Sequence, residues 1–294
     1  MKKSLIALSL GTLVLGIAEF VMMGILTNVA TSLNLSIPTA GHFISAYALG
    51  VCFGAPLLIA FRKQPPKQIL LILVGLMVIG NGFTAISPNY LTMLGARFIS
   101  GLPHGAYFGV ASIVASKLAD KGRESEAVAI MIAGMTIANL VGVPAGTFLS
   151  SLFTWRIVFI IVVVFALLTL YSISKFVPYV APLPDTGFKG QFQFLKDKAP
   201  WLILGATTLG NGGVFAWYSY INPLIIKYAP GGEMLGAAGI QIAFNLGNAV
   251  GAYLGGLPIH GGIGEQYSAL IGAGLTFCGF LMFYYFNRNY SKEK

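Results

Sequence analysis

Apolar residues in this chain come in uninterrupted runs about as long as a lipid bilayer is thick. A helix needs roughly 20 apolar residues to cross the hydrocarbon core, and soluble helices and strands are instead apolar on one face only. Such runs predict an all-α, polytopic membrane protein with about nine transmembrane helices. The predicted spans are residues 4–30, 40–61, 68–86, 90–115, 126–153, 156–176, 200–226, 232–255 and 266–286.

The composition excludes the common soluble classes. Only 9% of the 294 residues are charged, against roughly 25% in a typical soluble domain. Too few charges remain to cover an ordinary water-exposed surface, which excludes a soluble enzyme and a disordered chain. Cys52 and Cys278 lie inside apolar runs without cysteine or histidine at ligand spacing, so we expect neither a disulfide nor a metal site.

Lysine and arginine mark one side of the predicted bundle. Lys2 and Lys3 precede the first span, and ten more basic residues lie at or after the ends of the second, fourth and sixth spans. The alternate loops of this half contain only Arg156. Because basic loops stay in the cytoplasm, we predict a cytoplasmic amino terminus. The net charge of +9 follows from these loops, and no basic stripe indicates a nucleic-acid partner.

The same charge rule fails after the seventh span. Arg288, Lys292 and Lys294 make the tail basic, although a count of nine spans places it outside. The loop at 255–265, which the count places inside, has no lysine or arginine. Both anomalies disappear if an odd number of helices is missing between residues 226 and 232. The predicted parts are a six-helix bundle at 1–178, a cytoplasmic linker at 179–199 and a partial three-helix bundle at 200–294.

Four segments of the first six spans resemble the motifs of one family of transporters. They are GIAEFVMMGIL at 16–26, ISAYALG at 44–50, ARFISGLPHG at 96–105, and GVPAGT at 142–147 followed by Trp155 and Arg156. Together they resemble the major facilitator superfamily, in particular the arabinose-efflux-permease-like branch of its drug:proton antiporters. The resemblance implies twelve helices in two six-helix halves.

Measured against that family, the second half is incomplete. Residues 230–236 and 241–248 resemble its eleventh helix, and helices eight to ten have no counterpart. Three is an odd number, in agreement with the charge count. Thr27 stands where the family has a proline near the end of helix one. The loop at 54–67 also lacks the aspartate that helps to lock the family's cytoplasmic gate.

Glu19 and Arg97 are the only formally charged side chains deep inside a predicted span. An arginine there costs roughly 2.5–3.5 kcal/mol on insertion scales, so an intramembrane ion suggests function. With a rise of about 1.5 Å per residue the two lie at similar depth and can pair. We expect Glu19 to carry the coupled proton and Arg97 to tune its proton affinity. The alternative is a static ion pair that only fixes helix packing.

His104 lies two helical turns after Arg97 on the same face, where it can relay protons or simply hydrogen-bond a neighbouring helix.

Further candidates are expected to line the substrate cavity, to kink the fifth span through an antiporter motif, or to form a cytoplasmic gate loop. For the aromatic residues of span seven, an interfacial belt is an equal alternative. The cavity candidates are Phe20, Met23, Phe108, Asn139, Asn211, Phe215 and Trp217. The motif residues are Gly142, Pro144 and Gly146, and those of the gate loop are Arg62, Lys63 and Lys67.

The resemblance implies a proton-coupled antiporter of the inner or plasma membrane that exports small drug-like or sugar-like molecules by alternating access. The proton gradient is then the energy source, and no cofactor or metal is expected. The sequence contains no nucleotide-binding glycine pattern that would indicate an enzyme. The alternative is a transport-inactive, internally deleted protein that keeps only the N-terminal bundle. The expected partners are an unidentified small molecule and the lipid bilayer, and no pattern indicates an oligomeric state.

Overall fold

The computed structural model is built of helices. By its internal contacts the chain divides into two compact units, Met1–Ala238 and Gly239–Lys294. The first unit extends past residues 178 and 199, and the three-part division at those positions stays a prediction. The described residues are 2–57, 61, 63–182, 196–221, 223–224, 243–244, 246–247, 250–251, 253–255, 257–258, 262 and 267–290.

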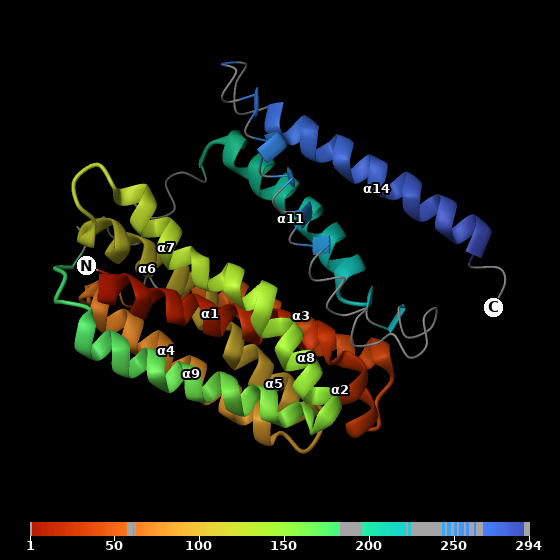
Figure 1. The fold of residues 1–294 in the computed structure, drawn as a ribbon, viewed down its shortest axis with the longest axis horizontal. Helices are drawn as coiled ribbons and strands as arrows, with labels where there is room; N and C mark the ends of the chain where they lie inside the picture. The colour runs from red at the N-terminus through yellow and green to blue at the C-terminus, as the bar shows by residue number, and fades with distance from the viewer. Residues whose placement is uncertain are drawn as a thin grey trace. The chain divides into compact units, whose positions relative to one another are not determined.

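Six stretches of the described chain are long and apolar enough to cross a membrane, and they confirm the first six predicted spans as helices. Figure 1 shows them as one bundle, in which α4 packs against α9 and α1 against α7. The helices are α1 (Lys2–Gly24), α2 (Leu26–Ser32), α3 (Ile37–Leu57), α4 (Pro66–Ile86), α5 (Tyr90–Gly101), α6 (Pro103–Leu118), α7 (Glu124–Ile137), the π-helix η2 (Ala138–Gly142), α8 (Val143–Leu152) and α9 (Trp155–Phe176).

Two further helices belong to the predicted second half. α11 (Lys198–Tyr218) corresponds to the seventh predicted span and α14 (Ser268–Tyr290) to the ninth. Most of the eighth span, 232–255, lies outside the described residues, as does the junction at 226–232 where the charge rule fails.

Proline explains two interruptions within spans. Pro103 opens α6 directly after α5, because its ring lacks the N–H that would continue the hydrogen bonding of α5. Pro144 lies in the first turn of α8, and the turn before it, Ala138–Gly142, is a π-helix. A π-turn re-spaces the backbone hydrogen bonds, as is common where a helix interior is disturbed. The kink predicted for the fifth span stays a prediction, and the structure shows a π-helix at that place.

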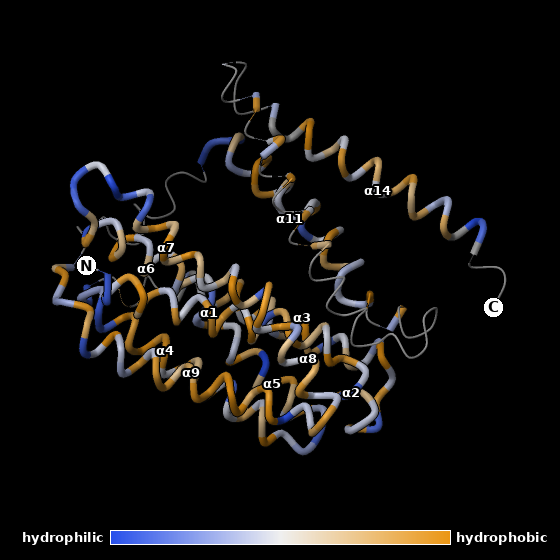
Figure 2. Tube along the Cα trace, viewed as in Figure 1, coloured by the Kyte–Doolittle hydropathy of each residue, from blue (hydrophilic) through white to orange (hydrophobic). Residues whose placement is uncertain are grey.

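The outward faces of the bundle are apolar. Large side chains such as Ile137, Leu140 and Val141 are more than half exposed. Figure 2 shows hydrophobic residues along the helices, whereas hydrophilic ones gather in loops such as that between α6 and α7. An apolar surface of this extent would promote aggregation in water but matches the hydrocarbon core of a bilayer.

Glycines let α3 and α5 approach closely, and this contact positions the site described below. A Cβ atom at Gly101 would overlap the backbone carbonyl of Tyr47, and one at Gly50 would overlap that of Phe98. Small residues at such crossings are typical of membrane helix pairs, which gain stability from close packing.

We expect Gly101→Ala to destabilise the protein by about 1–3 kcal/mol, because the new methyl group must push α3 away from α5. Gly95→Ala is the matched control on the same helix, since no heavy atom lies within 4 Å of the place that its new methyl group would occupy. This control should be neutral or stabilising by up to about 1 kcal/mol, the difference in helix propensity. Thermal unfolding in detergent compares the two. Equal stability of both variants would contradict close α3–α5 packing.

Candidate functional site

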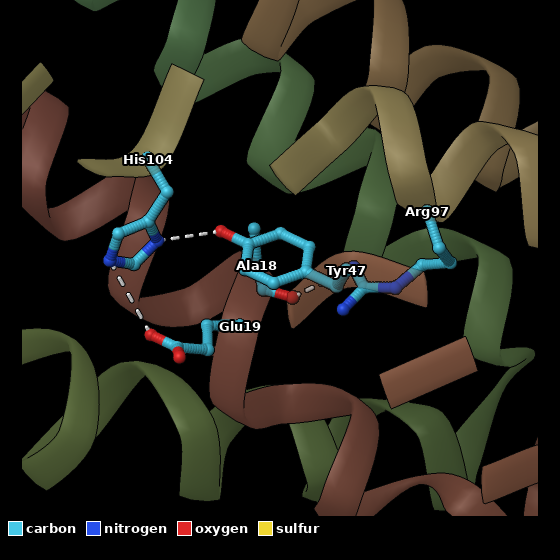
Figure 3. A network of polar contacts seen from close by, with 5 residues as sticks. All are labelled: Ala18, Glu19, Tyr47, Arg97 and His104. Atoms are coloured by element: carbon cyan, nitrogen blue, oxygen red, sulfur yellow. Dashed lines mark hydrogen bonds and ion pairs between the residues drawn. The ribbon is translucent and has the colours of Figure 1, made fainter. Parts of the chain in front are cut away.

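Four ionisable side chains from four helices meet inside the bundle. Glu19 comes from α1, Tyr47 from α3, Arg97 from α5 and His104 from α6, as Figure 3 shows. Arg97 and Tyr47 are almost completely buried, whereas the side chains of His104 and Glu19 keep a small exposed fraction. Such a cluster is costly in a membrane protein and indicates function.

The Arg97 side chain is completely buried, with 0% of its surface exposed. Its Nη1 donates to the carbonyl of Ala18 at 2.9 Å, and its Nε donates to the carbonyl of Phe43 at 3.4 Å. The guanidinium also lies over the ring of Tyr47, with Cζ 4.5 Å from the ring centroid. Its Nη2 has no hydrogen-bond partner among the described residues. Arg97 therefore connects α5 to the backbones of α1 and α3.

His104 connects Glu19 to Tyr47. Its Nε2 lies 3.6 Å from Oε2 of Glu19, and the two side chains are 11% and 19% exposed. Its Nδ1 lies 2.9 Å from the hydroxyl of Tyr47 in a buried hydrogen bond. The ring of Phe108 stacks on the imidazole with centroids 5.3 Å apart. Both ring nitrogens of His104 thus face a polar group.

The two predicted charges do not form the direct pair that the sequence suggested. In the described part of the chain no ion pair joins Glu19 to Arg97, because the guanidinium donates to two main-chain carbonyls instead. Arg97 holds the carbonyl of Ala18, the residue next to Glu19 in α1 (Figure 3). The connection between the charges runs through His104 and Tyr47.

The sequence reasoning missed Tyr47. It lies in the segment at 44–50 that carries the resemblance, and a tyrosine hydroxyl in an apolar helix needs a partner when buried. This requirement for a partner could have marked Tyr47 as a candidate, but the identity of the partner depends on how the helices pack.

The structure brings some of the predicted cavity residues together. Phe20 lies beside Phe215, with ring centroids 6.0 Å apart, and Phe108 reaches the ionisable cluster through His104. Met23 and Asn139 are buried in α1 and η2. On α11, Asn211 and Trp217 are exposed.

The motif glycines of the fifth span face α1. A Cβ atom at Gly142 would approach Ile17, and one at Gly146 would approach Val21. Their shared role in the structure is close packing of the η2–α8 segment on the helix that carries Glu19. The exposed face of this segment is formed by other residues, Leu140 and Val141 among them.

The predicted gate loop lies at the end of the bundle that holds the amino terminus (Figure 1). Lys67 donates to the carbonyl of Ser174 near the end of α9 at 2.8 Å, and Lys63 is exposed. Ser4 donates to the carbonyl of Phe176 at 2.7 Å, which brings the start of α1 to the same place. Arg62 lies outside the described residues.

Comparison with known proteins agrees with this architecture. A family model described as Major Facilitator Superfamily matches residues 8–287. AraJ of Escherichia coli (strain K12) is 38% identical over 366 residues, covering 94% of this chain and 93% of AraJ. The inner membrane transport protein YdhP of the same organism is 34% identical, covering 86% of this chain and 65% of YdhP. The chloramphenicol resistance protein of Streptomyces lividans is 26% identical, covering 85% of this chain and 64% of that protein.

A solved structure has the same fold. The bacterial homologue of the human lysosomal transporter Spinster, in an inward-facing and unoccupied conformation, superposes with a TM-score of 0.68 at 19% identity. The match covers 90% of this chain and 62% of that structure.

The match to AraJ also measures what this chain lacks. The matched region of 366 residues exceeds the 294 residues of the whole chain by 72. At least that many residues of AraJ therefore have no counterpart here. At about 1.5 Å per helical residue they would suffice for more than two membrane crossings.

Proposed function

The chain belongs to the Major Facilitator Superfamily and is a multi-pass membrane protein of a transporter family; from this premise we propose that it is a proton-coupled antiporter. It exports small, drug-like or sugar-like organic molecules by alternating access, in exchange for protons. Its location is the inner membrane, with the lysine-rich end of the bundle in the cytoplasm.

One observation carries this proposal: a carboxylate inside the bundle lies 3.6 Å from an imidazole and near a fully buried arginine. Glu19 holds the transported proton on its carboxylate. His104 faces this carboxylate through Nε2, and the positive charge of Arg97 favours release of the proton. The side chain of Glu19 is 19% exposed, which leaves it accessible to protons and substrate.

The role of Arg97 combines charge with attachment. Its hydrogen bond to the Ala18 carbonyl holds the backbone of α1 beside Glu19. Movement of the Arg97 side chain during alternating access changes the distance between the cation and the carboxylate. The proton affinity of Glu19 is thereby linked to which side of the membrane the site faces.

The test uses the full chain in proteoliposomes with a pH-sensitive dye trapped inside. Chloramphenicol, the compound in the name of one relative, and L-arabinose are loaded in turn and allowed to leave by dilution. Exit of a transported probe is expected to acidify the lumen, because protons enter in exchange. Protein-free liposomes and a protonophore are the controls. Movement of either probe without any proton flux would contradict antiport.

A second candidate function has its own support, the 72 or more AraJ residues without a counterpart. A chain without that segment is a transport-inactive relative that keeps the N-terminal bundle. Inserting the corresponding AraJ segment at residues 226–232 distinguishes the two. Flux in both proteins supports the antiporter, and flux only after the insertion supports the inactive relative.

A further inference from the structure

Tyr47 lies between the two ends of the ionisable cluster. Its hydroxyl contacts Nδ1 of His104 at 2.9 Å, and its ring lies under the Arg97 guanidinium. We propose that Tyr47 is a positioning residue, which donates its hydroxyl hydrogen to Nδ1 and so holds the hydrogen of the neutral imidazole on Nε2, facing Glu19. This role rests on the proposed proton coupling at Glu19 and adds the residue that fixes which nitrogen of His104 carries the hydrogen.

The geometry limits the alternatives. A neutral imidazole carries one hydrogen, and the nitrogen without it is an acceptor. If the hydroxyl of Tyr47 donates to Nδ1, the hydrogen of His104 must lie on Nε2, 3.6 Å from Oε2 of Glu19. If the hydroxyl accepts instead while Glu19 is ionised, Nε2 presents a lone pair to the carboxylate, and two acceptors face each other.

The position of Arg97 favours Tyr47 as the donor. The guanidinium lies 4.5 Å from the ring centroid of Tyr47, and a cation over a phenol withdraws electron density from the ring. This makes the hydroxyl a stronger donor and a weaker acceptor. As an acceptor from Nδ1–H, it would also have to direct its hydrogen elsewhere, and within the described residues His104 is its hydrogen-bond partner.

The ionisable groups around Tyr47 come from three helices. Glu19 lies on α1, Arg97 on α5 and His104 on α6. α9 contributes the apolar ring of Phe159, whose centroid lies 5.7 Å from Cζ of Arg97. In the described part of the structure, the proton balance at Tyr47 therefore depends on this one carboxyl, one imidazole and one guanidinium.

The donor role has a consequence for proton uptake. Glu19 and His104 share one proton when Glu19 is a carboxylate and the imidazole is neutral. If the added proton makes His104 an imidazolium, both of its nitrogens carry hydrogen. Tyr47 must then turn from donor to acceptor. The hydroxyl of Tyr47 therefore reorients when the second proton is taken up.

Nitrogen-15 NMR of the histidine rings tests this directly in the full chain in lipid. The chain has three histidines, and replacing His42 and His260 by Gln leaves His104 as the single signal. Above neutral pH we expect a protonated Nε2 and an unprotonated, hydrogen-bonded Nδ1. Tyr47→Phe keeps the ring under Arg97 and removes the hydroxyl, so the Nδ1 resonance should move to a position typical of no hydrogen bond.

Tyr107→Phe is the matched control. Tyr107 is equally buried, lies three residues after His104 on α6, and donates to the backbone carbonyl of Leu8 at 3.0 Å. This variant should leave the His104 spectrum unchanged. A protonated Nδ1 in the unmodified protein, or identical His104 spectra with and without the Tyr47 hydroxyl, overturns the proposal.

If Tyr47→Phe does not fold, 3-fluorotyrosine placed at position 47 keeps the hydroxyl and makes it a stronger donor. The Nδ1 resonance should then move in the direction of a stronger hydrogen bond. No movement overturns the proposal.

The pH profile of flux provides the functional readout. Tyr47→Phe is expected to move the midpoint of probe-driven proton uptake downward, because it removes the acceptor that the imidazolium needs at Nδ1, and a hydrogen bond to a charged group is stronger than a neutral one. Tyr107→Phe should not move it, and a midpoint that is equally unmoved in Tyr47→Phe counts against the role. Because the spectra need neither substrate nor gradient, a protein without flux but with the expected spectra refutes the antiporter and leaves Tyr47's control of His104 supported.

Discussion

Replacing Glu19 by Gln is expected to reduce gradient-driven flux of the transported probe at least about 100-fold, the lower range for loss of a positioned proton-transfer group. Gln has nearly the same shape as Glu, and its amide can still meet Nε2 of His104, which lies 3.6 Å from the present carboxylate. What it cannot do is bind and release a proton. Flux is measured in proteoliposomes with an imposed pH gradient.

The same variant should continue to exchange substrate when no gradient is applied. This separates a loss of coupling from a loss of folding, since an unfolded protein does neither. Glu126→Gln is the matched control, because Glu126 is an exposed carboxylate that binds Arg123 at 2.7 Å at the start of α7. Full gradient-driven flux in Glu19→Gln would show that the coupled proton binds elsewhere.

Arg97→Lys is expected to lower the free energy of unfolding by about 1.5–3 kcal/mol, the value of one hydrogen bond to a charged group. The guanidinium uses two nitrogens at once, toward the carbonyls of Ala18 and Phe43, and stacks on an aromatic ring. The ammonium group of lysine is a compact point charge, and it cannot reproduce both hydrogen bonds and the stacking of the planar guanidinium. The lost bond is not replaced by water, since the side chain is wholly buried.

Arg156→Lys makes the same change at a partly exposed site. Arg156 also donates to a backbone carbonyl, that of Ser87 at 3.0 Å, and lies over the ring of Trp155. Water can replace the lost bond there, so we expect a loss below about 1 kcal/mol. Unfolding of both variants is followed in mixed detergent micelles. A similar small loss in both would mean that the two backbone contacts of Arg97 add little to stability.

The sequence predicted which residues belong to the site, but it did not predict how their side chains are arranged. Glu19, Arg97 and His104 stand out because each is ionisable within an apolar run. Similar depth suggested that Glu19 and Arg97 pair. Depth is one coordinate of three, and the rotation of each helix decides which side chains meet. In the structure this rotation turns Arg97 toward backbone carbonyls and Glu19 toward His104.

The fifth span gives a second example. Its Gly142, Pro144 and Gly146 predict a kink, because proline removes a backbone donor and glycine adds freedom. A π-turn at 138–142 and the packing of both glycines on α1 appear only in the structure. The partner of a small residue is set by the opposite helix.

By itself the sequence determined the transmembrane helices of the first half, the basic end of the bundle and the superfamily. Each of these follows from local properties, because about 20 consecutive apolar residues suffice for a span and a few lysines identify a loop. Tertiary structure alone decided that Tyr47 meets His104 across 57 residues of chain and that Arg97 reaches Ala18 across 79. Apolar helices slide and rotate against one another at little cost in hydrophobic burial. Their register is fixed instead by close glycine contacts and by buried hydrogen bonds, which exist only once the helices have packed.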